Sequence, residues 1–284
     1  MSFEASEIAP LFVPPGHFYS PVVLPAEAER CISALEATPW PEAIPGIALD
    51  RQEMRRTWRS LVPAMRTAPF AEVPGNLRYG YDNNAYSWGD GAVLHAMIRR
   101  YRPRRIIEVG SGWSSACTLD TVDGYLGGRC ELTFIDPYPA LLLRLSGDVE
   151  ARATIVPQTL QSVPLETFDA LEADDILFID STHVVRTGSD CCTAIFDILP
   201  RLKPGVMIHI HDMFWPFEYP RLWAVEENRS WNEIYLVRAL LTNNPDYQIV
   251  MFNDFMAKME ADLVHDTFPD FMRASGAALW LRKL

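Results

Sequence analysis

The chain has 284 residues, of which 49% are hydrophobic and 22% are charged, so it can bury a sizeable core as one α/β domain with an elaborated N-terminal part. Its net charge of −12 opposes attraction to nucleic-acid phosphates. No apolar run reaches the ~18–20 residues that span a bilayer, and no signal peptide opens the chain. Five cysteines without a Cys-x-x-Cys pair argue against a disulfide or zinc framework. We therefore expect a cytoplasmic protein with a small-molecule substrate and neither nucleic acid nor membrane as partner.

The first 86 residues are rich in proline and weakly periodic. Apolar residues at helical spacing predict two helices in this part, near residues 25–37 and 50–66. Residues 15–20 and 79–86 mix aromatic with hydrogen-bonding side chains, which suits either a lid over an active site or structural packing. We expect residues 1–86 to form an N-terminal helical and loop extension with a candidate lid, and residues 87–284 to form the main domain. Exposed aromatics in the extension would suit a homo-oligomer contact.

From residue 87 onward the pattern indicates alternating strands and helices. Ser87-Trp-Gly-Asp90 resembles a capping box and predicts a helix that ends near residue 101. Ser230-x-x-Glu233 predicts another helix start by the same pattern. Apolar runs predict strands at residues 105–109, 131–136, 154–156, 176–179, 206–210, 247–252 and 277–281. Such alternation predicts a parallel sheet, and we expect the last strand to pair back against the strand before it.

The turn after the first strand carries the clearest functional signal. Gly110 and Gly112 let backbone approach a ligand without a Cβ, and a helix beginning near Trp113 offers unpaired N–H groups. The second strand ends about 25 residues downstream in Asp136, whose carboxylate can bind both hydroxyls of a ribose. A nicotinamide dinucleotide would fit the same geometry, but Ser115 replaces the third glycine of that motif. An ordinary strand-to-helix turn is the remaining alternative.

These residues resemble the class I S-adenosylmethionine-dependent methyltransferases, whose first strand carries Glu-x-Gly-x-Gly and whose second strand ends in an acid. The resemblance covers roughly residues 90–284. It implies a Rossmann-like, seven-stranded, mostly parallel sheet with helices on both faces, and it implies that Asp136 holds the cofactor ribose. The residues implied to line the methionine half of the cofactor are Glu108, Gly110, Ser111, Gly112, Trp113, Ser114 and Ser115.

Polar residues follow the fourth and fifth strands. Because ligands gather at the carboxyl ends of strands in open α/β sheets, we expect Asp180, His183, His211 and Asp212 to converge near the transferred methyl group. An imidazole there can act as a general base, and carboxylates with imidazole can bind a divalent metal. Asp180 is also expected to contact the cofactor, unless it merely caps the following segment. His209 lies two residues deeper and is predicted to be a buried core histidine.

Asp-x-x-His after one strand and acids after the next resemble a narrower group, the metal-dependent methyltransferases related to macrolide-sugar O-methyltransferases and the cephalosporin hydroxylase family. The resemblance implies Asp180 as a metal ligand, His183 as the general base and Asp212 as the second acid. His211 stands in place of the first acid, which leaves two carboxylates and one imidazole. That set favours manganese, iron or zinc over magnesium, and a site without metal is the alternative.

An aromatic loop at residues 213–221 follows Asp212. So many aromatics are unusual in an exposed loop, and we predict that this one faces the substrate. Arg221 would bind an acidic group of the substrate or form an ion pair with Glu218.

The sequence thus predicts an S-adenosylmethionine-dependent O-methyltransferase acting on a small polar or sugar-containing metabolite. Its catalytic residues would be His183 and Asp180, and a divalent metal would be held by Asp180, His211 and Asp212. Two alternatives differ in class. One is a metal-dependent oxygenase or other nonmethylating enzyme on the same scaffold, and the other is a noncatalytic cofactor-binding protein.

Overall fold

The computed structural model describes residues 11–147 and 149–284, which divide into two compact units. The smaller unit contains residues 11–40 and Tyr219–Trp231, and the larger contains Pro41–Glu218 and Asn232–Leu284. The sheet and all the candidate site residues belong to the larger unit. Among the helices of the described ranges, none is long and apolar enough to cross a bilayer.

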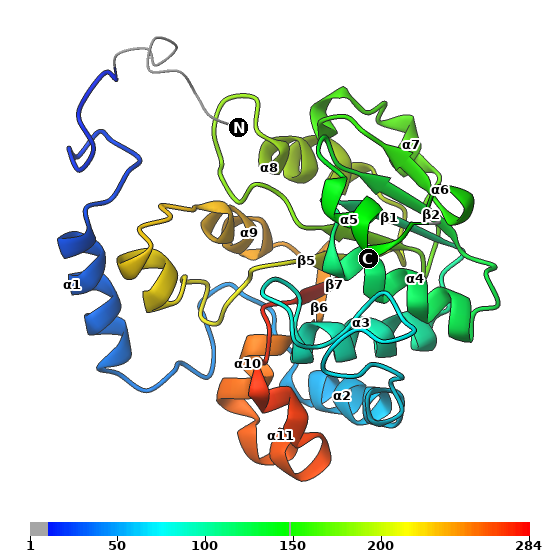
Figure 1. The fold of residues 1–284 in the computed structure, drawn as a ribbon. Coiled ribbons are helices and arrows are strands. Elements are labelled where there is room, and N and C mark those ends of the chain that lie inside the picture. Colours follow the sequence, from blue (N-terminus) through cyan, green and yellow to red (C-terminus); the bar gives the residue numbers. More distant parts are fainter. Residues whose placement is uncertain (1–10, 148) are drawn as a thin grey trace. The chain divides into compact units, whose positions relative to one another are not determined.

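The larger unit is built on a seven-stranded sheet with the order β3-β2-β1-β4-β5-β7-β6 (Figure 1). Strands β1 to β5 pair in parallel, whereas β7 is antiparallel to both of its neighbours. The strands are β1 Arg105–Val109, β2 Glu131–Ile135, β3 Thr154–Val156, β4 Ile176–Ile179, β5 Met207–Ile210, β6 Tyr247–Phe252 and β7 Leu279–Lys283. This is the predicted Rossmann-like, mostly parallel architecture, and the returning last strand is confirmed.

Helices connect the strands, and α2, α3 and α4 pack side by side (Figure 1). The α-helices are α1 Pro25–Glu36, α2 Arg51–Arg66, α3 Trp88–Tyr101, α4 Trp113–Tyr125, α5 Ala140–Leu145, α6 Val149–Arg152, α7 Glu166–Asp169, α8 Asp190–Cys192, α9 Glu233–Leu241, α10 Asn253–Met259 and α11 Ala261–Thr267. The 3₁₀ and π segments are η2 Leu160–Ser162, η3 Thr193–Ile198, η4 Leu199–Arg201, η5 Leu222–Glu226 and η6 Pro269–Arg273. Because parallel crossovers are right-handed and the strand order reverses between β1 and β4, α4 and residues 190–201 lie on opposite faces of the sheet.

The two predicted capping boxes are wrong. Helix α3 starts where it was expected, whereas α9 starts two residues later than a cap at Ser230 predicts. The Ser87 hydroxyl donates to the carbonyl of Tyr81 instead of capping α3. Helix α9 begins at Glu233 with Asn232, not Ser230, as its N-terminal cap residue. The acids of both patterns, Asp90 and Glu233, are buried and turn towards histidine side chains.

Residues 79–86, one of the two candidate lid segments, pack inside the larger unit. The side chains of Tyr79, Tyr81 and Tyr86 are all buried. Tyr81 stacks on Trp88 with 4.5 Å between ring centroids, and the hydroxyl of Tyr86 lies 3.2 Å from Nε2 of His209. These contacts agree with the alternative that residues 79–86 serve structural packing. Their role as a lid, and the domain boundary after residue 86, stay predictions.

In the smaller unit, Arg221 forms ion pairs with helix α1. Its guanidinium lies 2.5 Å from a carboxylate oxygen of Glu29 and 2.7 Å from one of Glu36. Glu218 accepts a hydrogen bond from the hydroxyl of Tyr235, and its pairing with Arg221 stays a prediction. The positive charge of Arg221 is thus neutralised by the chain itself.

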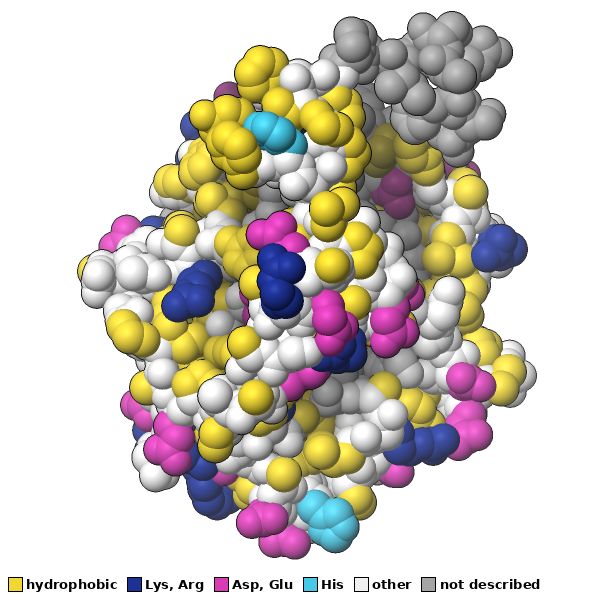
Figure 2. All heavy atoms as spheres, turned by 90° about the vertical axis from the view of Figure 1, so that its left-hand side faces the viewer, with side chains coloured by type: hydrophobic (Ala, Val, Ile, Leu, Met, Phe, Trp, Pro, Cys, Tyr) yellow, Lys and Arg dark blue, Asp and Glu magenta, His cyan; other side chains and the backbone are white. Residues whose placement is uncertain are grey.

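Exposed hydrophobic side chains gather in the N-terminal part of the smaller unit. Phe12 is 90% and Phe18 is 81% exposed, and Leu11 and Tyr19 are also exposed. Figure 2 shows hydrophobic side chains, coloured yellow, gathered beside one another near its top. Clusters of this kind are typical of contact surfaces, and the homo-oligomer stays a prediction.

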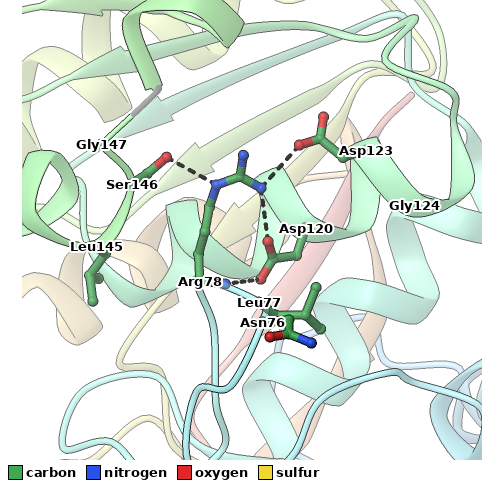
Figure 3. Close-up of a pocket in the computed structure, with 9 residues that line it drawn as sticks. All are labelled: Asn76, Leu77, Arg78, Asp120, Asp123, Gly124, Leu145, Ser146 and Gly147. Carbon is green, nitrogen blue, oxygen red and sulfur yellow. Dashed lines mark hydrogen bonds and ion pairs between the residues drawn. The ribbon is translucent and has the colours of Figure 1, made fainter.

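A buried ion-pair network fixes the segment that leads into the tyrosines. The guanidinium of Arg78 points towards Asp120, Asp123 and Ser146 in a depression of about 500 Å³ (Figure 3). Its Nη1 lies 2.9 Å from a carboxylate oxygen of Asp120 and 3.0 Å from one of Asp123. Asp120 also accepts hydrogen bonds from the backbone N–H groups of Arg78 and Tyr79. Asp120 and Asp123 thus neutralise Arg78 within this depression.

Replacement of Asp120 by alanine should lower the free energy of unfolding by about 3 kcal/mol, because it leaves Arg78 without its buried partner. The side chain of Asp120 is 1% exposed, whereas that of Asp123 is 32% exposed. The matched control Asp123→Ala should therefore cost about 1 kcal/mol or less. Urea unfolding followed by circular dichroism measures both, and equal losses would contradict the assignment.

Candidate active site

The strand ends of β1, β2, β4 and β5 lie in register across the sheet. The residues that directly follow them therefore emerge in one row, in the order Asp136, Gly110, Asp180 and His211. The row crosses the point between β1 and β4 at which the strand order reverses. In open α/β sheets this is where a crevice forms at the carboxyl ends of the strands.

A cavity of about 400 Å³ opens at this edge of the sheet. Its walls come from the ends of β1 and β2, from residues 159–161 and from the segment after β4, and they include Gly110, Asp136 and Asp180. This volume lies in the range of small-molecule and cofactor sites. Tyr138, Gln161 and Arg186 also line the cavity, and we did not single them out from the sequence.

Gly110 is required by packing as well as by any ligand. A Cβ built on it would lie 2.2 Å from the carbonyl oxygen of Asp180, and its φ is +82°. Both the contact and the backbone conformation exclude other residues. We expected the missing Cβ to leave room for a ligand, but much of that room is occupied by the backbone at the end of β4.

Glu108 lies behind the cavity and supports the glycine turn. Its Oε1 accepts hydrogen bonds from the hydroxyls of Ser114 and Ser115, and its Oε2 has no hydrogen-bond partner among the described residues. Burial raises the pKa of Glu108 to about 8, against the effect of the two serine donors. Of the predicted residues from Glu108 to Ser115, Gly110 lines the cavity directly, together with Val109.

Asp136 is held with its carboxylate at the cavity wall. One oxygen accepts hydrogen bonds from the backbone N–H and the hydroxyl of Ser111, and the other accepts from the backbone N–H of Tyr138. Neighbouring backbone thus fixes the orientation of the carboxylate. Ser111 therefore contacts Asp136, and it is not among the residues that line the cavity.

The structure brings Asp180, His183, His211 and Asp212 together around one point. Nε2 of His183 lies 3.4 Å from Asp180 and 3.2 Å from Asp212. Nδ1 of His211 lies 3.5 Å from Asp180 and 3.4 Å from Asp212. We call these four side chains the strand-end cluster. Asp180 belongs both to this cluster and to the cavity.

Each histidine of the strand-end cluster has a buried carboxylate on its outer side. Nδ1 of His183 lies 2.9 Å from Glu233, which also accepts a hydrogen bond from the hydroxyl of Ser181. Nε2 of His211 lies 3.1 Å from Asp90. A carboxylate only accepts, so each bond places the ring proton on the outer nitrogen and turns the inner nitrogen to the cluster.

Local backbone conformation contributes to this arrangement. His183 and Asp212 have φ values of +61° and +59°, which are left-handed conformations that cost about 1 kcal/mol or more in residues other than glycine. The carbonyl of His183 accepts the N–H groups of Asn232 and Glu233 at the start of α9. This contact holds Glu233 beside the ring that its side chain binds.

The charges in the cluster shift one another's pKa values. Burial alone would lower the pKa of His183, but contacts with Asp180 and Glu233 raise it to about 10. Burial likewise opposes charging of His211, yet Asp212 and Asp180 hold the pKa of His211 well above its ordinary value. The carboxylates thus concentrate enough negative charge to demand a compensating cation, either protons on the rings or a metal ion.

The side chains present fit a divalent metal ion. Asp180, His183 and Asp212 each offer one ligand atom, and these atoms lie within 4.8 Å of one another. Nδ1 of His211 is buried and forms no hydrogen bond with any residue that the structure describes. Nitrogen and carboxylate oxygen together are a usual donor set for divalent first-row metals.

His209 confirms the expectation of a buried core histidine. Its ring stacks on Phe178 with centroids 3.9 Å apart, and the side chain is fully buried. Burial lowers the pKa of His209 well below its ordinary value. His209 is therefore a neutral ring that packs beneath His211 of the strand-end cluster.

Asp90 and Glu233, the two outer carboxylates, were not predicted as site residues from the sequence. One available signal was that glycines flank Asp90. A Cβ on Gly89 would meet the carbonyl oxygen of Ser275 at 2.1 Å, and one on Gly91 would meet the hydroxyl of Tyr79 at 2.0 Å. Such tight flanks are typical of a buried helix start, where an acid needs an internal partner.

Comparison with known proteins identifies the family. A model described as "Methyltransferase domain" matches residues 107–213. An uncharacterized protein of Archaeoglobus fulgidus is 31% identical over 173 residues, which cover 60% of this chain and 78% of that protein. The chain therefore contains a class I S-adenosylmethionine-dependent methyltransferase domain.

Solved structures similar to this methyltransferase are distant. The apo structure of CmcI-N160 is 19% identical with a TM-score of 0.43, covering 70% of this chain and 72% of that one. PaMTH1 of Podospora anserina, an SAH-bound methyltransferase, is 15% identical with a TM-score of 0.41 and covers 91% and 96%. A putative O-methyltransferase from Klebsiella pneumoniae is 18% identical with a TM-score of 0.38 and the same coverage. At these scores, details of the site rest on the chain's own residues.

Replacement of Gly110 by alanine should abolish cofactor binding, because the new Cβ would force the β1 turn away from Asp180. Gly124 in α4 is the matched control, since a Cβ there would meet nothing within 4 Å. Gly124→Ala should retain S-adenosylhomocysteine affinity and gain about 0.5–1 kcal/mol in stability. Calorimetric titration tests both variants, and unchanged binding by Gly110→Ala would refute the close approach.

Replacement of Glu108 by glutamine should flatten the pH dependence of stability in the cofactor-free protein. The pKa of Glu108 rises from 4.5 to about 8 on folding. Glu108 therefore loses its proton at a lower pH in the unfolded chain than in the folded protein. Wild-type stability should fall as the pH rises through this window and level off above the folded pKa. The melting-temperature advantage of Glu108→Gln should therefore grow between pH 5 and 8, and a constant difference would contradict the assignment.

Proposed function

We propose that this methyltransferase transfers the methyl group of S-adenosylmethionine to a hydroxyl of a small polar metabolite, such as a sugar-containing one. The observation that carries the proposal is that Asp180 lines the cavity and also belongs to the strand-end cluster. A cofactor in the cavity would therefore lie beside groups able to activate a hydroxyl. Proximity of this kind is a large part of the rate gain in group transfer.

The cofactor would lie along the row of strand ends. Asp136, fixed by Ser111 and Tyr138, would accept hydrogen bonds from the ribose hydroxyls. The turn at Gly110 would hold the methionine half, and buried Glu108 would fix this turn through the hydroxyls of Ser114 and Ser115. The sulfonium would then face Asp180.

His183 would take the proton of the acceptor hydroxyl. Its Nε2 faces the strand-end cluster, and its Nδ1 is bound to Glu233. This arrangement orients the ring and stabilises the imidazolium that forms when the proton arrives. Asp180, 3.4 Å from Nε2, would help to position the ring against the acceptor.

A divalent ion would be held by Asp180, His211 and Asp212. When bound, it supplies positive charge that lowers the pKa of the acceptor hydroxyl and offsets the two carboxylates. The same positive charge would favour neutral His183, the form that can accept a proton. In this arrangement Asp180, His211 and Asp212 would bind the metal ion, and His183 would accept the proton.

A nonmethylating, metal-dependent oxidation is the second candidate function. It is favoured by one observation, that two imidazoles and two carboxylates surround the same point. Stoichiometry separates the two reactions, because methyl transfer forms one S-adenosylhomocysteine per product, whereas oxidation consumes oxygen. The test is a panel of hydroxylated metabolites with S-adenosylmethionine and oxygen monitored together. Cofactor binding without turnover of any acceptor would instead favour a noncatalytic binding protein.

Replacement of His183 by glutamine should lower kcat about 10²–10⁴-fold, the usual contribution of a general base. The affinity for S-adenosylhomocysteine should stay within a few-fold, because His183 faces the acceptor side. His95→Gln is the control, since His95 is also a buried histidine but its Nδ1 contacts Thr121 in α4. Equal kcat losses in both variants would point to general destabilisation and contradict the role of His183.

A further inference from the structure

We infer that Asp90 and His211 form a built-in carboxylate–histidine unit that makes the strand-end centre a site for an imidazole-preferring transition metal ion, such as Fe²⁺, Co²⁺ or Zn²⁺, rather than Mg²⁺. The inference rests on the proposed function, because it names the class of metal that the methyltransferase centre takes. It assigns Asp90 as a positioning residue that acts through His211.

Asp90 orients the ring of His211. Asp90 accepts hydrogen bonds from the amide of Asn253 and from the backbone N–H groups of Ala277 and Ala278. Its second oxygen lies 3.1 Å from Nε2 of His211. Since all its other contacts are donors, Asp90 is an acceptor here, and the ring proton of His211 belongs on Nε2. In the neutral ring, Nδ1 then has a lone pair that points inward.

The lone pair of His211 Nδ1 faces two carboxylates. Nδ1 of His211 lies 3.5 Å from Asp180 and 3.4 Å from Asp212, and it forms no hydrogen bond with any described residue. These separations are long for charge-assisted hydrogen bonds. They are close to the ~3.3–3.4 Å between neighbouring ligands of a tetrahedral ion with bonds of ~2.0–2.1 Å. The geometry suits ligands facing a common ion better than groups bound to one another.

The choice of ion follows from the ligands. Mg²⁺ prefers oxygen ligands and keeps much of its water, whereas imidazole suits Fe²⁺, Co²⁺ and Zn²⁺. Metal-bound histidines commonly donate their other N–H to a carboxylate, which raises the basicity of the ligand nitrogen. Asp90 provides this partner from α3, and it is anchored by backbone on the opposite side. His211 is therefore preorganised to ligate through Nδ1.

The test uses Co²⁺ and the methyltransferase with its full chain. A ligating His211 should give a paramagnetically shifted ring N–H signal in the proton NMR spectrum of the Co²⁺ protein. The signal should persist in the control His95→Gln and disappear in His211→Asp. In His211→Asp, the ratio of Mg²⁺ to Co²⁺ dissociation constants should fall at least about 10-fold.

A second variant tests the positioning residue. Asp90→Asn should weaken Co²⁺ binding about 10–100-fold and speed exchange of the His211 N–H signal with solvent. Circular dichroism and S-adenosylhomocysteine affinity, measured on the same samples, report whether each variant is folded. If Asp90→Asn fails to fold, the His211→Asp comparison decides the inference alone.

The outcomes separate the inference from the proposed function. Wild-type protein that binds S-adenosylhomocysteine but gives no shifted N–H signal with Co²⁺ overturns the inference and leaves methyl transfer standing. An unchanged metal preference in His211→Asp overturns it as well. A shifted N–H signal that depends on His211, in a protein that transfers no methyl group, supports the metal assignment and contradicts the proposed reaction.

Discussion

The buried carboxylate of Asp90 holds together the half of the sheet edge on which the candidate chemistry depends. It sits in the first turn of α3, accepts backbone N–H groups at Ala277 and Ala278 just before β7, and contacts His211 after β5. A buried acid needs such partners, because an unpaired one would be strongly destabilising. Because Asp90 needs these partners, the start of α3, the end of β5 and the start of β7 are held together at one carboxylate.

Around that point, sheet register determines which side chains meet. Strands β1, β2, β4 and β5 end level with one another, so the residues after them form a row. Gly110 lets the row close, since any side chain there would collide with the backbone of Asp180. The cavity and the strand-end cluster consequently share Asp180.

The cluster is electrostatically incomplete without a cation. Two carboxylates face two imidazoles, and the outer carboxylates Asp90 and Glu233 add further negative charge. Protons on the rings balance this charge in one state and a metal ion in another. The left-handed backbone of His183 and Asp212 shows that the fold accepts local strain to keep these groups facing one another.

Much of the fold follows from local sequence, because the strands at residues 176–179 and 206–210 are short apolar runs bounded by polar residues. The positions of Asp180, His183, His211 and Asp212 follow from the same reasoning, since parallel strands deliver their ends to one edge. Asp90 and Glu233 were not predicted, because each lies three residues after a serine and fits a capping pattern. Only tertiary structure shows that both acids turn to histidines that are distant in sequence. The pairing of Arg221 with Glu29 and Glu36 is equally nonlocal.

We propose that the cofactor lies across the strand ends and presents its sulfur to the strand-end cluster. A crystal structure of the complex with S-adenosylhomocysteine tests it most directly. The account predicts ribose hydroxyls on Asp136, the homocysteine half over the turn at Gly110, and the sulfur facing Asp180 and His183. Ligand bound elsewhere, or bound there with the sulfur turned away from the cluster, would contradict it.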